Sequence, residues 1–374
     1  MSNSASFRHV KVIGAGLIGT SIALGLKQAG YELTVEDEDI SAEEIAQDLI
    51  GQKRGLDQSP GASEPELNEP DPELVVIATP ILAVPHLVKE VAERYPASRV
   101  IDIGGLKSDV VREVEKFPEV ATRFCSTHPM AGREISGALA ARGDLFEGRI
   151  WIYTPVTGTE RRTIDCALEV IAALGAIPVL RGSVEHDRII AGISHLPQIV
   201  SSLLSAALSE MSVEDLGLAG AGLRDVSRLA ASNPDLWAEL LHANRSSLND
   251  FLVQFTNLLN DLSTSLQNDD LRKTHEILEM GRLNHRRIPG KHGGKKRDYW
   301  YLPIVIDDRP GQLALIFDAC KDVEVNVEDL SIEHTPGQES GLVTLALSHD
   351  DAIKVFDHLM QDGWKVHQPR ESIG

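Results

Sequence analysis

The chain has 374 residues, more than one ordinary hydrophobic core holds, which predicts two or three domains. Hydrophobic residues make up 42% and charged residues 25%, as in soluble globular proteins. The formal net charge of −20 argues against a nucleic-acid partner and against an anionic membrane surface, because both would repel the chain.

The N-terminus and the cysteines bear on the compartment in which the chain works. Residues 1–8 lack the apolar core of a signal peptide, and the most apolar helical stretch, residues 189–208, is interrupted by polar residues and a proline, so we expect no membrane span. The chain has three cysteines, Cys125, Cys166 and Cys320. Because their number is odd and their spacing wide, we expect neither disulfides nor a metal site. We therefore expect a cytoplasmic protein.

Residues 1–182 carry the pattern of a doubly wound α/β domain of the Rossmann type. Short apolar runs predict strands at residues 10–13, 33–35, 74–78, 100–103, 123–126, 150–153 and 177–180. Helical segments separate these runs, the first at residues 17–29, which predicts a mostly parallel sheet covered on both faces. The Pro- and Glu-rich residues 59–72 have little to bury and predict a surface loop.

The first strand is joined to the first helix by a glycine-rich loop, Gly14-Ala15-Gly16-Leu17-Ile18-Gly19. In such a loop the first glycine permits a tight turn, the second lets the backbone approach a pyrophosphate, and the third lets helix and strand pack closely. Because a strand precedes the loop and a helix follows it, we interpret it as a dinucleotide site rather than as a turn without function.

Acidic residues follow the second predicted strand, at positions 36–39. A carboxylate there accepts hydrogen bonds from the ribose hydroxyls of NAD and repels the additional phosphate of NADP, so NAD is the expected cofactor. We assign this role to Asp37 and expect its neighbours to be solvated. Thr79 and Pro80 follow the next strand, at the edge of the sheet where ligands bind; a strand-ending turn is the alternative.

His128 follows the strand predicted at residues 123–126 and precedes Pro129, which fixes the chain direction where the side chain leaves the sheet. An imidazole with a pKa near neutrality is suited to accept a hydroxyl proton while a hydride leaves the same carbon. We predict that His128 is the catalytic base of a dehydrogenase; a structural or exposed histidine is the alternative.

Residues 183–288 lack strand signals and predict an all-α domain. Apolar residues recur at three- and four-residue steps from 237 to 266, and one helix of that length would extend about 45 Å, more than this domain can cover by itself. We expect a second subunit to cover the remainder, which predicts a homodimer through this dimerisation domain.

Two polar groups stand out in the helical domain. Arg224 and Arg228 are four residues apart on one predicted helical face, where a guanidinium can hold a carboxylate through two hydrogen bonds. One of them could instead pair with an acid such as Glu134, and we assign the substrate to Arg228 first. His195 and Gln198 form a polar patch on the first helix of the domain; a satisfied core histidine is the alternative for His195.

A basic, glycine-rich linker at residues 289–298 leads to a third domain at residues 299–374. Its pattern predicts strands at 299–306, 325–332, 341–347 and 364–367, with helices at 311–320 and 350–361. This βαββαβ order predicts an α+β, ferredoxin-like fold.

Five segments, taken in order, carry a resemblance to a known family: GAGLIG, STHPMAGRE, LFEGRIWIYTP, SHLPQ and GAGLRDVSRLAASNPDLW. Over about residues 9–288 the chain resembles the prephenate and arogenate dehydrogenases of tyrosine biosynthesis. The resemblance implies oxidative decarboxylation with NAD, in which hydride leaves the ring carbon that bears the hydroxyl and loss of carbon dioxide makes the ring aromatic.

The resemblance also implies roles for individual residues. His128 would accept the hydrogen bond of the substrate hydroxyl and act as base, and Arg228 would bind the ring carboxylate. His195 and Gln198 would face the substrate side chain, and Glu134 would belong to a polar network at the entrance.

The chain departs from the family at two positions. Many relatives carry serine where this chain has Gly105, so a second contact to the substrate hydroxyl is absent or supplied elsewhere. Relatives that prefer prephenate often have histidine at the position of Gln198, and a neutral glutamine tolerates the ammonium of arogenate. Prephenate is the expected substrate and arogenate the alternative.

Two other classes compete with this interpretation. A catalytically inactive nucleotide-binding regulator is supported by Gly105 alone, and the presence of both His128 and Arg228 speaks against it. A β-hydroxyacid dehydrogenase would need a lysine base in the helical domain, and residues 183–268 contain no lysine.

The C-terminal domain resembles an ACT domain, with the sequence DDRPGQL at its first turn and Asn326 entering the second strand. Such domains commonly bind amino acids between copies. We therefore expect tyrosine, or a related end product, to bind near Gly311 and Asn326; a domain that only assembles subunits is the alternative.

Overall fold

A computed structural model describes residues 7–52, 71–132, 137–288, 299–307, 309–334 and 340–371. Contacts divide the chain into two compact units, Met1–Lys273 and Thr274–Gly374. The first unit holds a parallel α/β sheet followed by helices, and the second holds an α+β fold. The expected fold class is confirmed.

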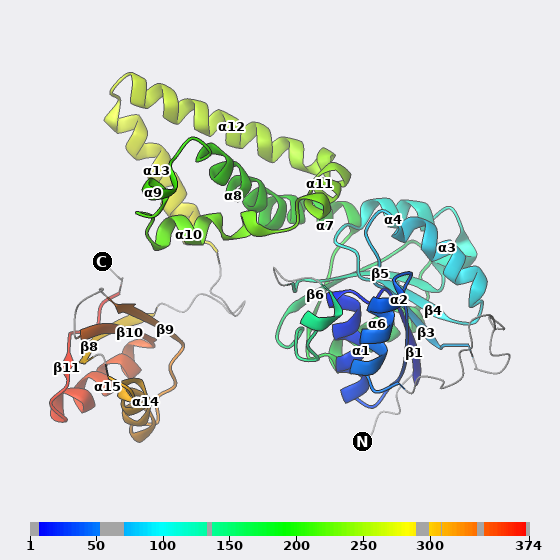
Figure 1. Ribbon diagram of the computed structural model, residues 1–374, viewed down its shortest axis with the longest axis horizontal. Helices are drawn as coiled ribbons and strands as arrows, with labels where there is room; N and C mark the ends of the chain where they lie inside the picture. The colour runs from blue at the N-terminus through cyan, green and yellow to red at the C-terminus, as the bar shows by residue number, and fades with distance from the viewer. Residues whose placement is uncertain are drawn as a thin grey trace. The chain divides into compact units, whose positions relative to one another are not determined.

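The first unit contains a seven-stranded sheet in the order β2-β1-β3-β4-β5-β6-β7 (Figure 1). Neighbouring strands pair in parallel, except β5 and β6, which are antiparallel. The strands are β1 (His9–Ile13), β2 (Glu32–Glu36), β3 (Leu74–Ile77), β4 (Arg99–Asp102), β5 (Phe124–Pro129), β6 (Ile150–Pro155) and β7 (Ile177–Leu180). Each expected strand is present, and β5 runs further than predicted, so His128 lies inside it.

Helices cover both faces of this sheet. In β3, Leu74 and Val76 face the layer of α1 (Leu17–Gln28) and α6 (Arg161–Ala173), whereas Val75 and Ile77 face the opposite layer. That opposite layer consists of α3 (Val84–Arg94), α4 (Ser108–Val114) and α5 (Pro118–Ala121). Because the strand is buried from both sides, its sequence is a continuous apolar run without polar alternation.

The strand order places a topological switch point at β1. β1 lies between β2 and β3, so the connections that leave the carboxyl ends of β1 and β3 run in different directions and open a crevice for a ligand. The glycine loop follows β1, and Thr79 follows β3. The remaining short elements of this domain are α2 (Ile40–Leu49) and η1 (Ala138–Ala140).

The helical part of the chain contains α7 (Ser183–Ile190), α8 (Leu196–Ala207), α9 (Val213–Leu216), α10 (Ala221–Ser227), η3 (Arg228–Ala231), α11 (Pro234–Ala243), α12 (Arg245–Gln267) and α13 (Leu271–His285). The long helix expected from residue 237 to 266 is interrupted at Asn244. The Asn244 side chain is buried and its amide donates to the carbonyl oxygen of Asp187 at 2.8 Å, which holds this break against α7. The single-helix expectation was wrong for this reason.

A π-helical turn, η2 (Ala191–His195), joins α7 to α8. Pro197 has no N–H for the carbonyl four residues before it, so the turn that precedes it widens. By length and composition the stretch Ser183–Ala207 would suffice to cross a membrane. Three polar residues of this stretch, His186, Asp187 and His195, are nevertheless buried, and they form hydrogen bonds to other parts of the same unit. We therefore interpret the stretch as a helix packed within the fold.

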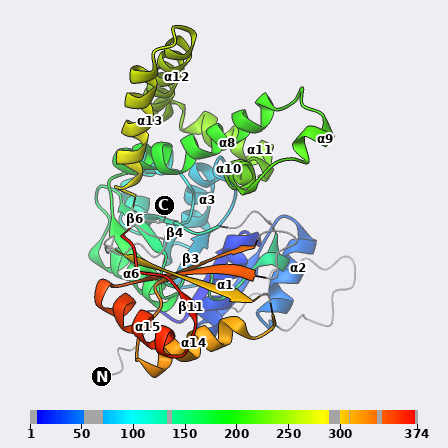
Figure 2. The same cartoon turned by 90° about the vertical axis from the view of Figure 1, so that its left-hand side faces the viewer.

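The second unit has the strand order β11-β8-β10-β9, and all of its neighbouring strands are antiparallel. Its elements are β8 (Trp300–Asp307), α14 (Gln312–Asp322), β9 (Asp329–His334), β10 (Ser340–Leu347), α15 (His349–Gln361) and β11 (Lys365–Val366). Figure 2 shows α14 and α15 on the same face of the sheet, where a shared apolar core joins them to β8 and β10. This is the expected ferredoxin-like arrangement.

Two expected effector residues lie in turns of this unit. Gly311 precedes α14 with a φ of +91°, a conformation that favours glycine. Asn326 is exposed and precedes β9 by three residues, because the strand begins only at Asp329. The expectation that Asn326 enters the second strand was wrong.

Candidate active site

A chain of three side chains lies at the carboxyl end of β5. Nδ1 of His128 is 2.9 Å from Nε2 of His186, and Nδ1 of His186 is 2.8 Å from Oδ1 of Asp187. The two carboxylate oxygens of Asp187 also accept hydrogen bonds from the backbone N–H groups of Lys107 and Ser108, both at 2.8 Å. The start of α4 thus anchors Asp187, which in turn contacts His186.

A buried ion pair supports the loop between β4 and α4. The ammonium of Lys107 donates to Oδ2 of Asp102 at 2.6 Å and to the carbonyl oxygen of Thr127 at 2.7 Å. Oδ1 of Asp102 accepts a hydrogen bond from the hydroxyl of Ser126. These contacts join the end of β4 to the end of β5 directly before His128.

Two adjacent glycines in this loop differ in the space around them. A Cβ at Gly104 would lie 2.6 Å from Cδ1 of Ile81 and 3.1 Å from Oδ2 of Asp102, so a larger residue there requires the end of the Ile81 side chain to move. A Cβ at Gly105 would lie 3.6 Å from Cδ2 of Leu240 and 3.8 Å from Nε2 of His128, which are ordinary contacts. Leu240 belongs to α11, so the helical part of the unit reaches the site.

Burial keeps the imidazoles of the site neutral. Desolvation lowers the pKa of His128 well below its usual value, and the neighbouring His186 and Lys107 lower it further. His128 as a whole is partly exposed to solvent. Burial lowers the pKa of His186, although the hydrogen bond to Asp187 acts to raise it. Burial also lowers the pKa of His195 to about 4.

The carboxylate of Asp187 stays ionised in this environment. Burial by itself would raise the pKa of Asp187, but hydrogen bonds from His186, Ser108 and Lys107 outweigh burial, and the pKa lies below its usual value. A neutral imidazole and an ionised carboxylate are the protonation states that general base catalysis by His128 requires.

The glycine loop has the geometry of a phosphate site. Gly14 has a φ of +110°, and a Cβ there would lie 2.4 Å from the carbonyl oxygen of Ala78; a Cβ at Gly19 would lie 2.0 Å from the carbonyl oxygen of Gly14. At Gly16, in contrast, a Cβ would have no neighbouring atom of the described residues within 4 Å. Gly16 stands at the N-terminus of α1 without a side-chain cap, so the helix N–H groups of Leu17 and Ile18 are left for an anion.

Four consecutive acids, at positions 36–39, begin with the last residue of β2, and their contacts differ. Glu36 pairs with Lys11 at 2.7 Å and with Arg94 at 2.8 Å, Asp39 caps α2, and Glu38 is exposed. Asp37 accepts a hydrogen bond from the backbone N–H of Ala15 and so lies against the glycine loop. Among the described residues, the Thr79 hydroxyl beside this loop is buried and has no hydrogen-bond partner.

On the helical side, His195 and Gln198 are both buried. Nδ1 of His195 is 3.2 Å from the amide nitrogen of Asn244, and its ring meets Trp237 edge to face at 5.8 Å. The amide nitrogen of Gln198 donates to the carbonyl oxygen of Leu229 at 2.9 Å. Within the described ranges, Oε1 of Gln198 is buried without a hydrogen-bond partner.

The two predicted substrate arginines lie on the exposed surface. Arg224 is in α10 and donates to the carbonyl oxygen of Ala219. Arg228 opens the 3₁₀ turn η3, next to Leu229, so the hydrogen bond from Gln198 to Leu229 holds this turn against α8. The two arginines therefore do not share one continuous helix. Glu134 lies outside the described residues.

Two family models match adjacent parts of the chain. The nucleotide-binding domain of prephenate dehydrogenase matches residues 22–180, and its dimerization domain matches residues 182–280. A Streptomyces niveus protein described as a probable prephenate dehydrogenase is 30% identical over 375 aligned positions, which cover 96% of this chain and 99% of that protein. The chain belongs to the prephenate dehydrogenase family.

Solved structures of this family share the fold. Prephenate dehydrogenase of Aquifex aeolicus, in complex with hydroxyphenyl propionate and NAD⁺, gives a TM-score of 0.66 at 24% identity and covers 77% of this chain and 100% of its own. Arogenate dehydrogenase of Synechocystis gives a TM-score of 0.59 at 26% identity and covers 75% of this chain and 99% of its own. The family resemblance expected from the five sequence segments is confirmed.

The sequence analysis did not find all residues of the candidate active site. His186 and Asp187 were missed because they lie far along the chain from their partners: 58 positions separate His186 from His128, and 80 separate Asp187 from Lys107. The available signal was an adjacent His-Asp pair on a helix that also carries Glu185 and Arg188. Asn244 was likewise hidden inside an apolar helical pattern.

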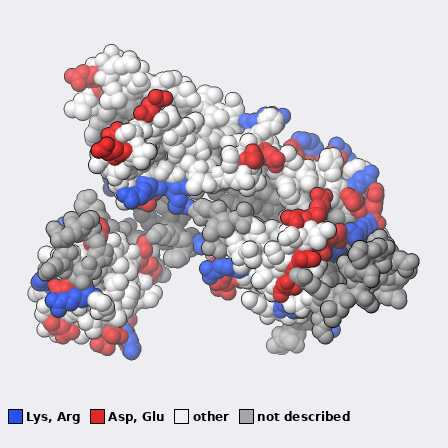
Figure 3. Space-filling view, viewed as in Figure 1, with Lys and Arg blue, Asp and Glu red and all other residues white. Residues whose placement is uncertain are grey.

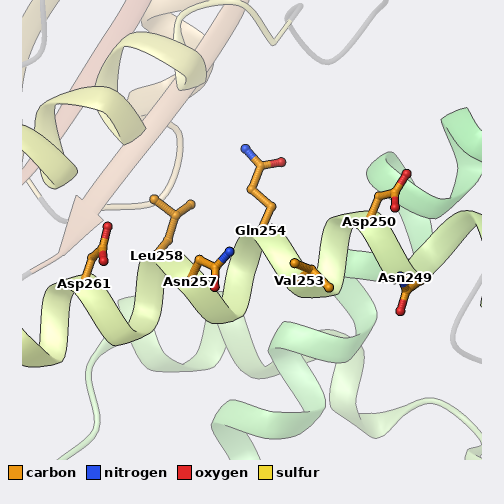
Figure 4. A pocket seen from close by; sticks show the side chains of 7 residues that line it. All are labelled: Asn249, Asp250, Val253, Gln254, Asn257, Leu258 and Asp261. Carbon is orange, nitrogen blue, oxygen red and sulfur yellow. The ribbon is translucent and has the colours of Figure 1, made fainter.

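The surface of α12 carries a different kind of feature. Figure 4 shows the side chains of this helix that line a hollow, two of them acidic, and Figure 3 shows mostly uncharged side chains over the helix. The hollow is lined by Asn249, Asp250, Val253, Gln254, Asn257, Leu258 and Asp261. All of them come from one helix of the dimerization domain, and none belongs to the histidine site. Of the large apolar side chains on this helix, Val253 (52% exposed) lines the hollow and Leu259 (58% exposed) is also exposed.

Proposed function

We propose that the protein is an NAD-dependent prephenate dehydrogenase that converts prephenate to 4-hydroxyphenylpyruvate. The observation that carries this proposal is the neutral imidazole of His128, which contacts His186 through Nδ1 and faces Gly105 with Nε2. The Streptomyces niveus relative supports prephenate as substrate, because its similarity extends over nearly the whole chain.

In this proposal the ring hydroxyl of prephenate donates a hydrogen bond to Nε2 of His128. Its proton passes to that nitrogen as the hydride leaves the same ring carbon. Bound NAD supplies the acceptor for this hydride. The bond to the ring carboxylate then breaks, its electron pair makes the ring aromatic, carbon dioxide leaves, and His128 returns the proton to the phenolate oxygen.

We assign the ring carboxylate to Arg228, because a guanidinium binds a carboxylate through two parallel hydrogen bonds and Arg228 lies beside the segment that Gln198 contacts. The parts proposed for Arg224 and for Glu134 at the entrance remain predictions. His195 is proposed to border the substrate through its ring, since its Nδ1 is already directed at Asn244.

The cofactor is NAD. The matched family domain binds a nucleotide, and the Aquifex aeolicus structure that shares the fold holds NAD⁺. The residues present fit this cofactor, since Gly16 leaves room for a pyrophosphate and the Thr79 hydroxyl is buried and has no partner among the described residues. We assign the ribose hydroxyls to Asp37, and the edge of the site to Thr79 and Pro80.

A second candidate substrate is arogenate, and one observation favours it. The carbonyl of Leu229 can only accept, so the amide nitrogen of Gln198 must face it and Oε1 is the atom left for a ligand. An oxygen acceptor suits the ammonium of arogenate better than the keto oxygen of prephenate. The Synechocystis relative is an arogenate dehydrogenase.

We further propose that the helical domain forms a homodimer, which its match to the dimerization domain and the exposed apolar side chains of α12 support. Tyrosine is proposed as an effector that binds near Gly311 and Asn326. A cytoplasmic location is proposed from the sequence.

The test is a spectrophotometric assay of the purified protein on prephenate and on arogenate, each with NAD and with NADP, with and without tyrosine. We expect reduction of NAD with prephenate and release of carbon dioxide. The variant His128→Asn should lower turnover about 10²–10⁴-fold and leave NAD affinity nearly unchanged. Wild-type turnover in this variant would assign the base elsewhere, and no turnover of either substrate would overturn the proposed function.

A further inference from the structure

We propose that His186 and Asp187 are positioning residues that hold His128 in the tautomer with its proton on Nδ1 and its lone pair on Nε2. The catalytic role of this tautomer rests on the proposed function. The tautomer itself depends only on which group donates and which accepts in the hydrogen bonds between His128, His186 and Asp187. The direction of these hydrogen bonds follows from the contacts, one group at a time.

The direction is set first at Asp187. The backbone N–H groups of Lys107 and Ser108 can only donate, and they lie 2.8 Å from the two carboxylate oxygens. Asp187 is therefore held as an ionised acceptor at the start of α4. An acceptor carboxylate 2.8 Å from Nδ1 of His186 requires the proton on that nitrogen.

The direction passes next to His186. This ring is fully buried and neutral, so with its proton on Nδ1 the nitrogen Nε2 carries a lone pair. Nε2 of His186 is 2.9 Å from Nδ1 of His128, and the shared proton must come from His128. The lone pair of His128 then lies on Nε2, the nitrogen nearest Gly105.

Other charged and titratable groups near the pair do not reverse this order. The ammonium of Lys107 is directed at Asp102 and at the carbonyl of Thr127, and its positive charge disfavours protonation of both imidazoles. His195 is neutral and hydrogen-bonds Asn244. Only protonation of His186 would make its Nε2 a donor and force His128 into the opposite tautomer, in which Nε2 cannot accept the hydroxyl proton.

The arrangement also stabilises charge during turnover. When His128 accepts a proton on Nε2, its ring becomes an imidazolium whose Nδ1–H points through His186 toward the carboxylate of Asp187. A buried carboxylate at the end of a short hydrogen-bond chain favours that cation, as the orienting acid does in a catalytic triad. Two rings in series make the active tautomer depend on both side chains.

The experiment reads the tautomer directly, by ¹⁵N NMR of protein labelled at histidine, with His128→Asn used to assign the signals. In the wild-type protein at neutral pH we expect a protonated Nδ1 and an unprotonated Nε2 for His128. The opposite assignment would overturn the proposal, whatever substrate the enzyme uses.

Variants then test the cause. In Asp187→Asn we expect the His128 tautomers to become mixed and kcat to fall about 10²–10⁴-fold, with NAD affinity unchanged. His186→Ala, which leaves the hydrogen bonds from the start of α4 to Asp187 in place, should lose activity similarly and regain part of it with imidazole in the buffer. The matched control is Asp109→Asn, which removes an exposed acid from the first turn of α4 and should change neither the tautomer nor kcat. An unchanged tautomer together with wild-type turnover in a folded Asp187→Asn variant would refute the proposal.

Discussion

The ammonium nitrogen of Lys107 lies 2.6 Å from Oδ2 of Asp102, and neither side chain is exposed to solvent. Such a pair is held by its remaining hydrogen bonds, here from Gly104 and Ser126 to Asp102 and from Lys107 to Thr127. It connects the loop before α4 to the strand that carries His128. The pair therefore belongs to the scaffold of the site.

Removal of one partner should be costly. Lys107→Met leaves the Asp102 carboxylate buried without its cation, and we expect the free energy of unfolding to fall by about 3–5 kcal/mol. Urea denaturation followed by circular dichroism measures this. The exposed pair of Lys116 and Glu113 provides the control, since Lys116→Met should cost less than about 1 kcal/mol. Equal effects of the two substitutions would show that burial of the first pair has no energetic consequence.

Gly105→Ser should be tolerated and should raise activity. The new Cβ meets only ordinary contacts, at 3.6 and 3.8 Å, and the added hydroxyl would lie beside Nε2 of His128. One further hydrogen bond to the substrate hydroxyl, worth about 0.5–1.5 kcal/mol, corresponds to a rise in kcat/KM of about 2–13-fold. Steady-state kinetics on the preferred substrate measure it.

The neighbouring glycine supplies the control for that substitution. Gly104→Ser would place Cβ 2.6 Å from the terminal Cδ1 of Ile81 and 3.1 Å from Oδ2 of Asp102, and we expect it to lower stability more than Gly105→Ser does. A Gly105→Ser protein as unstable as Gly104→Ser would contradict the contacts described for this loop.

Gln198→Glu tests the amide in substrate selection. A carboxylate in place of the free Oε1 would attract the ammonium of arogenate and repel the keto acid, so the ratio of kcat/KM for arogenate to that for prephenate should rise about tenfold or more. Gln198→His should lower the same ratio. Ratios equal to that of the wild-type protein in both variants would exclude contact between this side chain and the substrate side chain.

Stability should fall between pH 7 and pH 5. The pKa values of His128, His186 and His195 are lowered by burial, so below about pH 6.5 the unfolded chain binds protons that these side chains do not bind in the folded state. Each histidine can contribute up to about 1.4 kcal/mol per pH unit. Urea unfolding at a series of pH values measures the slope, which should be smaller in His195→Gln. A slope of zero would mean that the three rings titrate normally.

Apolar periodicity sufficed to predict the sheet, because each parallel strand is buried on both faces and reads as a continuous run such as Leu74 to Ile77. It did not locate the helix break at Asn244, because the break depends on a hydrogen bond to Asp187 that sequence spacing does not reveal. It also did not show that β9 begins after Asn326, since strand ends depend on pairing with β10.

The candidate site was predictable only in part. His128 was found because it stands next to a proline at the end of a strand, and Asp37 because its distance from the glycine loop is typical of nucleotide domains. The groups that orient His128 come from a helix that the chain reaches much later, and only folding brings them to α4.

The three glycines of one short motif obey constraints of different origin. Gly14 and Gly19 are enforced by the polypeptide itself, since a methyl group at either would collide with backbone oxygen. In the part of the chain that the structure describes, a methyl group at Gly16 would meet no neighbouring atom within 4 Å. Alanine there should yield a protein that folds and assembles normally yet excludes its dinucleotide, a reagent in which the architecture of the enzyme can be studied apart from its chemistry.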